Sequence, residues 1–199
     1  MKAPKSWKEV TIAQYYELCD AISMDWEDEM GKSVAMLSAL SGVPIKVLTD
    51  EIPAKELIKH IKDIAFIGDG KTKGHPSATL WVGRRRFYFD LLMRESSTSS
   101  FISINDYASD KEKSKLNLHN IMAIYCYELN WLGFRKKRTI ASQKEIAEYF
   151  KKNMTMDKAF IYSGFFLRSW VKLSKAILSY SERKMKKAMR EVTKQAQTL

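Results

Sequence analysis

The strongest candidate for chemistry in this chain is the string Gly70-Lys71-Thr72, which matches the end of a phosphate-binding loop. That loop begins with a glycine and follows a strand, so that backbone amides can surround a phosphate. Here the first glycine position is occupied by Ala65, and the residues before it have a helical pattern. The sequence therefore predicts a solvated connector at this place and no nucleotide site.

The side chains that could bind a metal or attack a carbonyl group are scattered. His60, His75 and His119 are far apart, and none has a Cys or another His at ligand spacing. The acidic run 27–29 is typical of a helix start, where the helix dipole favours carboxylates. No nucleophile motif such as G-x-S-x-G occurs. We therefore expect no enzymatic activity, no metal and no cofactor.

Basic residues are the remaining side chains that could act, and they gather late in the chain. Residues 1–134 hold 17 Lys and Arg against 18 Asp and Glu, whereas residues 135–199 hold 17 against 5, so the net charge of +11 comes from the last third. Charge concentrated in one region gives the electrostatic field a direction. This pattern indicates an anionic partner or a solvated basic face.

Two short basic clusters could hold nucleic acid by phosphate contacts and by stacking on nearby aromatic rings. Trp131 and Phe134 closely precede the second of these clusters, residues 135–138. An acidic protein partner is the alternative. The clusters are Arg84, Arg85 and Arg86, and then Arg135, Lys136, Lys137 and Arg138.

The elements that must position these residues are predicted to be mainly helical. Gly and Pro are scarce, at 8 and 4 residues, and apolar residues recur at helical spacing. We expect a mainly α protein of about 60–70% helix, an α+β chain whose one small β-hairpin lies at 79–92 and turns at Gly83. A capping box at Thr11–Gln14 begins the first helix, and Gly42 ends the second.

Composition shifts divide the chain into three predicted segments. Residues 1–67 form an N-terminal helical lobe, and residues 68–102 form the hairpin insert and a mobile connector. Residues 103–199 form a C-terminal helical lobe, with one helix covering 118–129 and a second capping box at Ser142–Glu145. The body is expected to be a compact bundle of these helices.

The last predicted helix runs from Thr155 almost to the end and changes character at Leu178. From Phe160 to Tyr180 it is apolar on more than one side, which is typical of a core helix. Beyond that point a thin apolar stripe remains, flanked by cations, and we expect it to project and to contact a protein partner. The stripe is Met185, Met189 and Val192, and the cations beside it include Lys184, Lys186, Lys187 and Arg190.

The chain has no apolar run long enough to cross a membrane, and its start carries no secretory signal. Cys19 and Cys126 both lie in apolar patterns, so we expect two small buried thiols and no disulfide. A reducing cytoplasm fits this composition.

Several segments, in this order, resemble small morphogenesis proteins of tailed bacteriophages, chiefly the tail assembly chaperones. The segments are WKEVTIAQYYEL, AMLSALSGVP, LWVGRRRFYFDLL, LNLHNIMAIY and MTMDKAFIYSGFFLRSW, which together touch most of the chain from Trp7 to Leu178. The resemblance implies a helical or α+β adaptor in the host cytoplasm that binds the tape measure protein and is commonly absent from the finished particle. The sequence leaves the oligomeric state open, an oligomer included. The alternatives are a permanent virion component, such as a neck or tail-completion protein, and a basic nucleic-acid-binding accessory protein.

Overall fold

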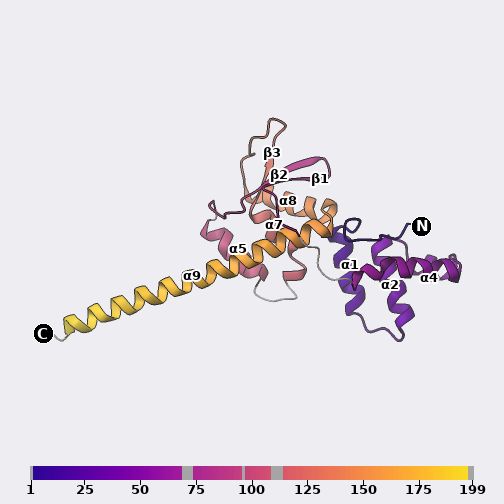
Figure 1. Cartoon of the computed structure of the whole chain (residues 1–199), viewed down its shortest axis with the longest axis horizontal. Coiled ribbons are helices and arrows are strands. Elements are labelled where there is room, and N and C mark those ends of the chain that lie inside the picture. Colours follow the sequence, from indigo (N-terminus) through magenta and orange to yellow (C-terminus); the bar gives the residue numbers. More distant parts are fainter. Residues whose placement is uncertain (1, 69–73, 96, 109–113, 197–199) are drawn as a thin grey trace.

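The computed structural model describes residues 2–68, 74–95, 97–108 and 114–196, without the side chains at 177, 178, 181, 187, 188 and 190–196. Helices make up 63% of the chain, and a three-stranded antiparallel sheet completes the fold, so the predicted mainly α class is confirmed. Figure 1 shows the short helices and the sheet gathered around one end of a long final helix. The helices are α1 (Ile12–Ser23), α2 (Glu29–Ser41), α3 (Ile45–Asp50), α4 (Ala54–Asp63), the 3-10 turn η1 (Ile64–Ile67), α5 (Thr98–Ala108), α7 (Leu118–Ile124), α8 (Ile140–Asn153) and α9 (Met156–Ala196). The strands are β1 (Thr79–Val82), β2 (Arg85–Phe89) and β3 (Cys126–Leu129).

The N-terminal helices begin and end where the sequence predicts. The Gln14 amide donates to the Thr11 hydroxyl at 3.3 Å, and the Thr11 amide donates to the Gln14 side chain at 2.9 Å, which confirms the capping box. α2 ends at Gly42, whose φ of 70° is left-handed and therefore favours glycine.

The predicted hairpin is confirmed, but it carries a third strand that was not predicted. Val82 pairs with Arg85, and the turn between them contains Gly83 at φ 54°. An ideal Cβ on Gly83 would lie 2.7 Å from the Tyr149 hydroxyl, so this turn needs glycine for space as well as for conformation. The single helix expected over 118–129 is wrong, because α7 ends at Ile124 and β3 pairs with the open edge of β2.

One hydrophobic core joins the sheet to the last two helices. The Phe87 and Phe150 rings lie 4.8 Å apart, and the Phe89 and Tyr162 rings lie 4.4 Å apart. The N-terminal segment reaches the start of α9, where the Met156 amide donates to the Val10 carbonyl at 2.8 Å. Buried residues from all three predicted segments belong to this core, and the segment boundaries stay a prediction.

The start of α8 differs from the predicted capping box. Its N-cap is Thr139, and the Ser142 amide donates to the Thr139 hydroxyl at 3.1 Å. The Ser142–Glu145 box is therefore wrong, because the helix begins one turn earlier. This shift leaves Glu145 inside the helix, where its carboxylate can reach the sheet.

The final helix confirms the predicted length but leaves the core sooner than expected. α9 spans 41 residues. Phe166 is fully buried and Trp170 is half-buried against Phe101 of α5, with ring centroids 6.3 Å apart. Val171 and Tyr180 are already 42% and 61% exposed. The prediction of a core helix through Tyr180 is therefore wrong, because the body does not reach that far along α9, as Figure 1 shows.

Both cysteines are free thiols, as predicted. Cys126 is buried, but it lies in β3 and not in a helix. Cys19 is only half-buried in α1. Burial raises the pKa of the Cys126 thiol well above its ordinary value, so this sulfur stays protonated and behaves as a small apolar side chain.

Candidate functional site

The predicted functional residues fall on two separate surfaces. We call the seven cations around the sheet the sheet cluster, and we call residues 171–196 of α9 the arm. The sheet cluster is Arg84, Arg85, Arg86, Arg135, Lys136, Lys137 and Arg138. In Figure 1 the far end of the arm lies well away from the sheet.

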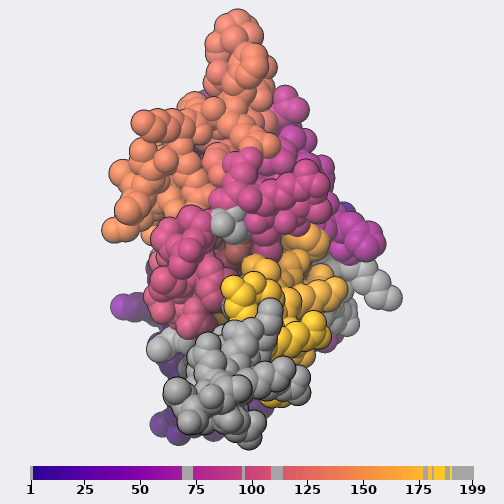
Figure 2. Space-filling model, turned by 90° about the vertical axis from the view of Figure 1, so that its left-hand side faces the viewer, coloured from indigo at the N-terminus to yellow at the C-terminus, as the bar shows by residue number. Residues whose placement is uncertain are grey.

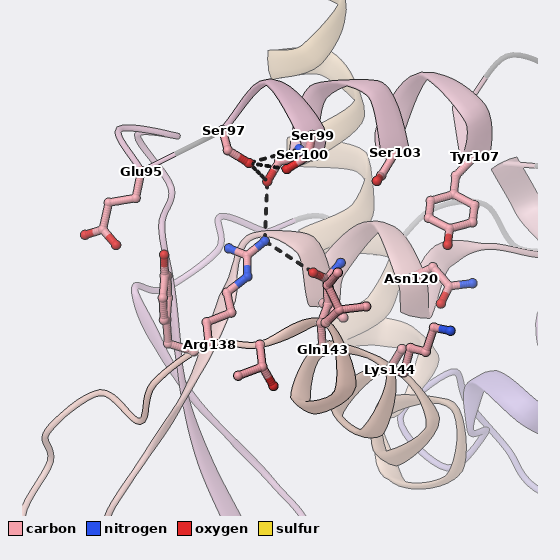
Figure 3. A pocket seen from close by; sticks show the side chains of 15 residues that line it. Glu95, Ser97, Ser99, Ser100, Ser103, Tyr107, Asn120, Arg138, Gln143 and Lys144 are labelled. Atoms are coloured by element: carbon pink, nitrogen blue, oxygen red, sulfur yellow. Dashed lines mark hydrogen bonds between the residues drawn. The ribbon is translucent and has the colours of Figure 1, made fainter.

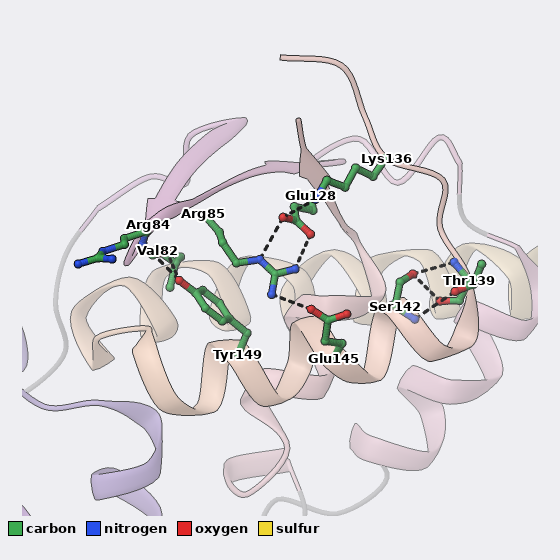
Figure 4. Close-up of polar contacts among 9 residues, drawn as sticks. All are labelled: Val82, Arg84, Arg85, Glu128, Lys136, Thr139, Ser142, Glu145 and Tyr149. Atoms are coloured by element: carbon green, nitrogen blue, oxygen red, sulfur yellow. Dashed lines mark hydrogen bonds and ion pairs between the residues drawn. The ribbon is translucent and has the colours of Figure 1, made fainter. Parts of the chain in front are cut away.

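Arg85 is held by two carboxylates, as Figure 4 shows. Its guanidinium donates to both oxygens of Glu128 and, at 2.9 Å, to Glu145 of α8. It also lies over the Tyr149 ring, 4.6 Å from the centroid. Lys136 adds a contact of 2.9 Å to Glu128. Burial opposes ionisation of Glu128, but the hydrogen bonds from Arg85 and Lys136 outweigh it and lower the pKa of this carboxyl.

Two more cations of the sheet cluster also have partners within the chain. Arg135 pairs with Glu95, and its guanidinium lies 3.9 Å from the centroid of the Tyr88 ring. Arg138 donates to the Ser100 hydroxyl at 3.4 Å and lies over the Tyr127 ring at 5.4 Å. Four of the seven cations named as a nucleic-acid surface therefore serve the fold, because their charge or their donors are already engaged.

The other three cations have a different environment. In the part of the chain that the structure describes, no carboxylate lies within ion-pair distance of Arg84, Arg86 or Lys137. Arg84 and Arg86 line a hollow of about 400 Å³, together with Trp81 and Trp131. Of the three cations without an ion pair, these two arginines share one hollow.

A polar pocket of about 590 Å³ lies between α5 and α8 (Figure 3). Arg138 and Lys144 give it positive charge, and hydroxyl groups from the start of α5 line it. The Ser97 hydroxyl contacts that of Ser99 at 2.7 Å. Among the described residues no imidazole or carboxylate hydrogen-bonds to these hydroxyls, so nothing there activates them as nucleophiles.

His119 and His60 lie in different surroundings. His119 is buried, and the Tyr16 hydroxyl lies 2.7 Å from its Nδ1. Burial lowers the pKa of His119 to about 4, so its ring is neutral near pH 7. His60 lies beside Glu56 and Asp63 of its own helix. Among the described residues no three metal-binding side chains lie together, and the string 70–72 lies outside the described residues.

The arm exposes the first part of the predicted stripe. Met185 and Met189 are 62% and 70% exposed. Lys184 and Lys186 are exposed, and the Lys184 ammonium lies 5.2 Å from the centroid of the Tyr180 ring. The other members of the predicted set, Lys187, Arg190 and Val192, have side chains outside the described residues.

The sequence of the arm also has a seven-residue apolar repeat. Val171 and Met185 are two such steps apart, and the sequence has Leu178 between them and Val192 one step further. A seven-residue apolar repeat is the pattern of helices that pair in coiled coils. A small residue follows three positions after each of Val171, Leu178 and Met185. These small residues are Ser174, Ser181 and Ala188.

Comparison with known proteins adds no relative, since no family model, no curated protein and no solved structure matches this chain. No helix in the described part of the chain combines the length and the apolar composition that a bilayer crossing requires.

Sequence reasoning did not identify the carboxylates that neutralise the sheet cluster. Glu128 follows Arg85 by 43 positions, and Glu95 precedes Arg135 by 40. Only knowledge of the strand pairing brings such residues together. It also did not single out Trp81, which joins Trp131 in one hollow although the two are far apart in the sequence.

Proposed function

We propose that this chain is a non-enzymatic binding protein of tailed-phage morphogenesis, a tail assembly chaperone that holds an amphipathic helix of a tail protein along its arm. The single observation that carries the proposal is that α9 continues past Trp170 with exposed apolar residues on it. The tape measure protein, a long helical chain with apolar stripes, is the partner that the family resemblance implies.

The arm has features of a docking element. Residues 171–196 would span about 39 Å at about 1.5 Å per residue. A helix gains most of its stability in proteins from packing its apolar face, and the exposed side chains of Val171, Met185 and Met189 lie on such a face. Methionine suits this role because its flexible side chain adapts to irregular partner surfaces.

Charge selects among the possible partners of the arm. Residues 171–196 hold eight Lys and Arg and two Glu. Two copies of this segment side by side would repel each other, whereas an acidic helix would be attracted. We therefore propose a partner helix with apolar residues at heptad spacing and carboxylates on its flanks.

The proposal is tested by two variants of the full chain. One changes Met185, Met189 and Val192 to Ser, and the other changes Lys184, Lys186, Lys187 and Arg190 to Gln. Each is produced with the tail proteins of the phage that encodes it, and the tape measure protein recovered with it is measured. We expect the Ser variant to lose the partner, because the stripe supplies the contact area. The Gln variant should bind more slowly, because its cations mainly steer association.

The contradicting result is retention of the tape measure protein by the Ser variant at the wild-type level. Binding of both variants to duplex DNA at two salt concentrations is the companion measurement. If only the Gln variant fails, and only on DNA, the arm is a nucleic-acid element and the proposal is wrong. Presence of the protein in purified particles would instead identify a permanent virion component.

A further inference from the structure

The hollow beside the hairpin tip is lined by two exposed tryptophans. Trp81 of β1 is 60% exposed, and Trp131, in the loop after β3, is 91% exposed. Both line the same hollow of about 400 Å³. In Figure 2 the segment after β3 projects at the top of the molecule. Single exposed apolar side chains are common, whereas exposed apolar side chains grouped in one place mark binding sites.

The loop that carries Trp131 is ordered by its own hydrogen bonds. The Asn130 amide donates to the Phe134 carbonyl at 2.9 Å, and the Asn130 side chain accepts from the Phe134 amide at 2.8 Å. The Gly133 amide closes the turn on the Asn130 carbonyl at 3.0 Å, with φ 86° at the glycine. Trp131 is therefore held outward by a formed turn, and the fold does not need its side chain.

The opposite wall of the hollow is anchored as firmly. The Tyr149 hydroxyl donates to the Val82 carbonyl at 3.1 Å and accepts from the Arg84 amide at 3.3 Å. These bonds fix the hairpin tip on α8, as Figure 4 shows, and leave the Arg84 side chain pointing away from the ion pairs. The pairing of β1, β2 and β3 in one sheet joins the two walls.

The charge of the hollow is positive. Glu128 is the carboxylate in the lining, and Arg85 and Lys136 already neutralise it. Arg84 and Arg86 have no carboxylate within ion-pair distance among the described residues. The hollow thus offers two guanidinium groups beside two indole rings. Guanidinium groups form bidentate hydrogen bonds with phosphates, and indole rings stack on planar aromatic rings.

We propose that this hollow binds single-stranded nucleic acid, with unpaired bases stacked on Trp81 and Trp131 and the phosphates contacting Arg84 and Arg86. Stacking on aromatic side chains within a basic groove is how proteins hold single strands without reading their sequence. A duplex fits poorly, because its bases are already stacked on one another. The site uses no residue of the arm, so it stands apart from the proposed chaperone function.

The test measures binding of the full chain to fluorescent oligothymidylate and oligouridylate of about a dozen nucleotides, and to a DNA duplex of the same length, by anisotropy over a range of salt. Trp131→Ala should weaken single-strand binding about 5- to 150-fold, the effect of losing one stacked base. Arg84→Gln with Arg86→Gln should make the salt dependence shallower by about 1.4 in logarithmic slope, for two lost phosphate contacts. The duplex should bind more weakly than either single strand.

Two control variants distinguish binding at this site from nonspecific electrostatic and hydrophobic binding elsewhere on the chain. Lys46→Gln with Lys55→Gln removes the same charge from α3 and α4, and Ile140→Ala removes an exposed apolar side chain near the sheet. Both should bind oligonucleotides as the wild type does. A preference for one of the two single strands would identify DNA or RNA as the natural source, and both results support the site.

Three results would overturn the proposal. The first is wild-type affinity in both the Trp131 and the arginine variants. The second is binding of the duplex as tightly as the single strands. The third is unchanged oligonucleotide binding when Trp131→Ala loses a tail protein in the co-purification assay, which would make the hollow a protein site. Melting curves of each variant confirm that the chain is folded before any result is counted.

Discussion

The sheet cluster and the arm are both rich in Lys and Arg, but among the described side chains carboxylates pair only with cations of the sheet cluster. Around the sheet, Glu128, Glu145 and Glu95 take up the charge of Arg85, Lys136 and Arg135. Along the arm, no carboxylate lies within ion-pair distance of the described cations. A run of basic residues is therefore weak evidence for an interface until its partners within the chain are known.

α9 itself has a buried part and an exposed part. Shortening a buried side chain of this helix gives the largest expected loss of stability. Phe166 is fully buried against Phe89 and Tyr125, with centroid distances of 6.2 and 4.8 Å. Phe166→Ala should lower the free energy of unfolding by about 3–5 kcal/mol, because it leaves a cavity. Met185→Ala, on the same helix, should change it by less than about 0.5 kcal/mol. Chemical denaturation of both variants checks this, and a large loss for Met185→Ala would mean that the arm packs on the body.

The body should also lose stability in mild acid, because His119 is buried and neutral. Its pKa is lowered to about 4 by burial, against about 6.5 in the unfolded chain. Between these values the unfolded state binds the extra proton, so the free energy of unfolding falls as the pH drops from about 6.5 to about 4. The total loss should reach about 3 kcal/mol. Denaturation at several pH values measures it.

The matched control for this pH effect is His119→Gln, which removes the titrating ring. The variant should be less stable at pH 7, because the hydrogen bond to Tyr16 is disturbed. Its stability should nevertheless depend less steeply on pH between about 4 and 6.5. If the unfolding free energies of the variant and the wild type fell equally with pH over this range, His119 would not be the group that causes the loss of stability in acid.

Removing the central carboxylate of the sheet cluster should cost less, about 2 kcal/mol. Glu128→Gln leaves Arg85 and Lys136 without their shared partner in a half-buried position, and a lost hydrogen bond to a charged group is worth about 1.5–3 kcal/mol. The comparison variant is Lys184→Gln with Lys186→Gln on the arm, which should leave the unfolding free energy within about 0.5 kcal/mol. Thermal and chemical unfolding measure both variants. If Glu128→Gln and the arm variant lowered the unfolding free energy equally, the two surfaces would not differ in this way.

The smallest expected effect concerns the turn that fixes the hairpin tip. Gly83→Ala should destabilise the protein by about 1–2 kcal/mol, since φ is 54° and the added Cβ would meet the Tyr149 hydroxyl. Tyr149→Phe with Gly83→Ala tests the cause, because it removes that oxygen. Because the Tyr149 hydroxyl also bonds the backbone of Val82 and Arg84, the double variant is compared with Tyr149→Phe alone. Gly83→Ala should cost less stability in the Tyr149→Phe background than in the wild type, and an equal cost in both would assign the whole effect to backbone conformation.

Local patterns were enough to predict most helices, the hairpin and the long last helix, because capping residues, glycines and apolar spacing act over a few residues. β3 could not be predicted in this way, since it exists only because β2 offers an open edge 37 positions earlier, as the Phe89 and Cys126 pair shows. The early departure of α9 from the core also escaped prediction. Val171 and Leu173 are as apolar as core residues, and only the extent of the body decides that they are exposed.

The sequence was enough to predict which residues make up the candidate surfaces, but not which of their cations are already ion-paired within the chain. Sequence placed Arg84 and Arg86 in the same run as Arg85, and it had no means of separating the paired arginine from the two that remain available. In contrast, the stripe at Met185 and Met189 followed from helical spacing alone, and both side chains are exposed.

The central claim is that the arm serves a partner and not the fold. A chain that ends at Lys175 tests it most directly, by a melting curve and by recovery of the tape measure protein during co-production. We expect a melting temperature within about 2 °C of the full chain, because the described side chains beyond Lys175 are exposed, together with loss of the tape measure protein. A markedly lower melting temperature, or full recovery of that partner by the shortened chain, would contradict it.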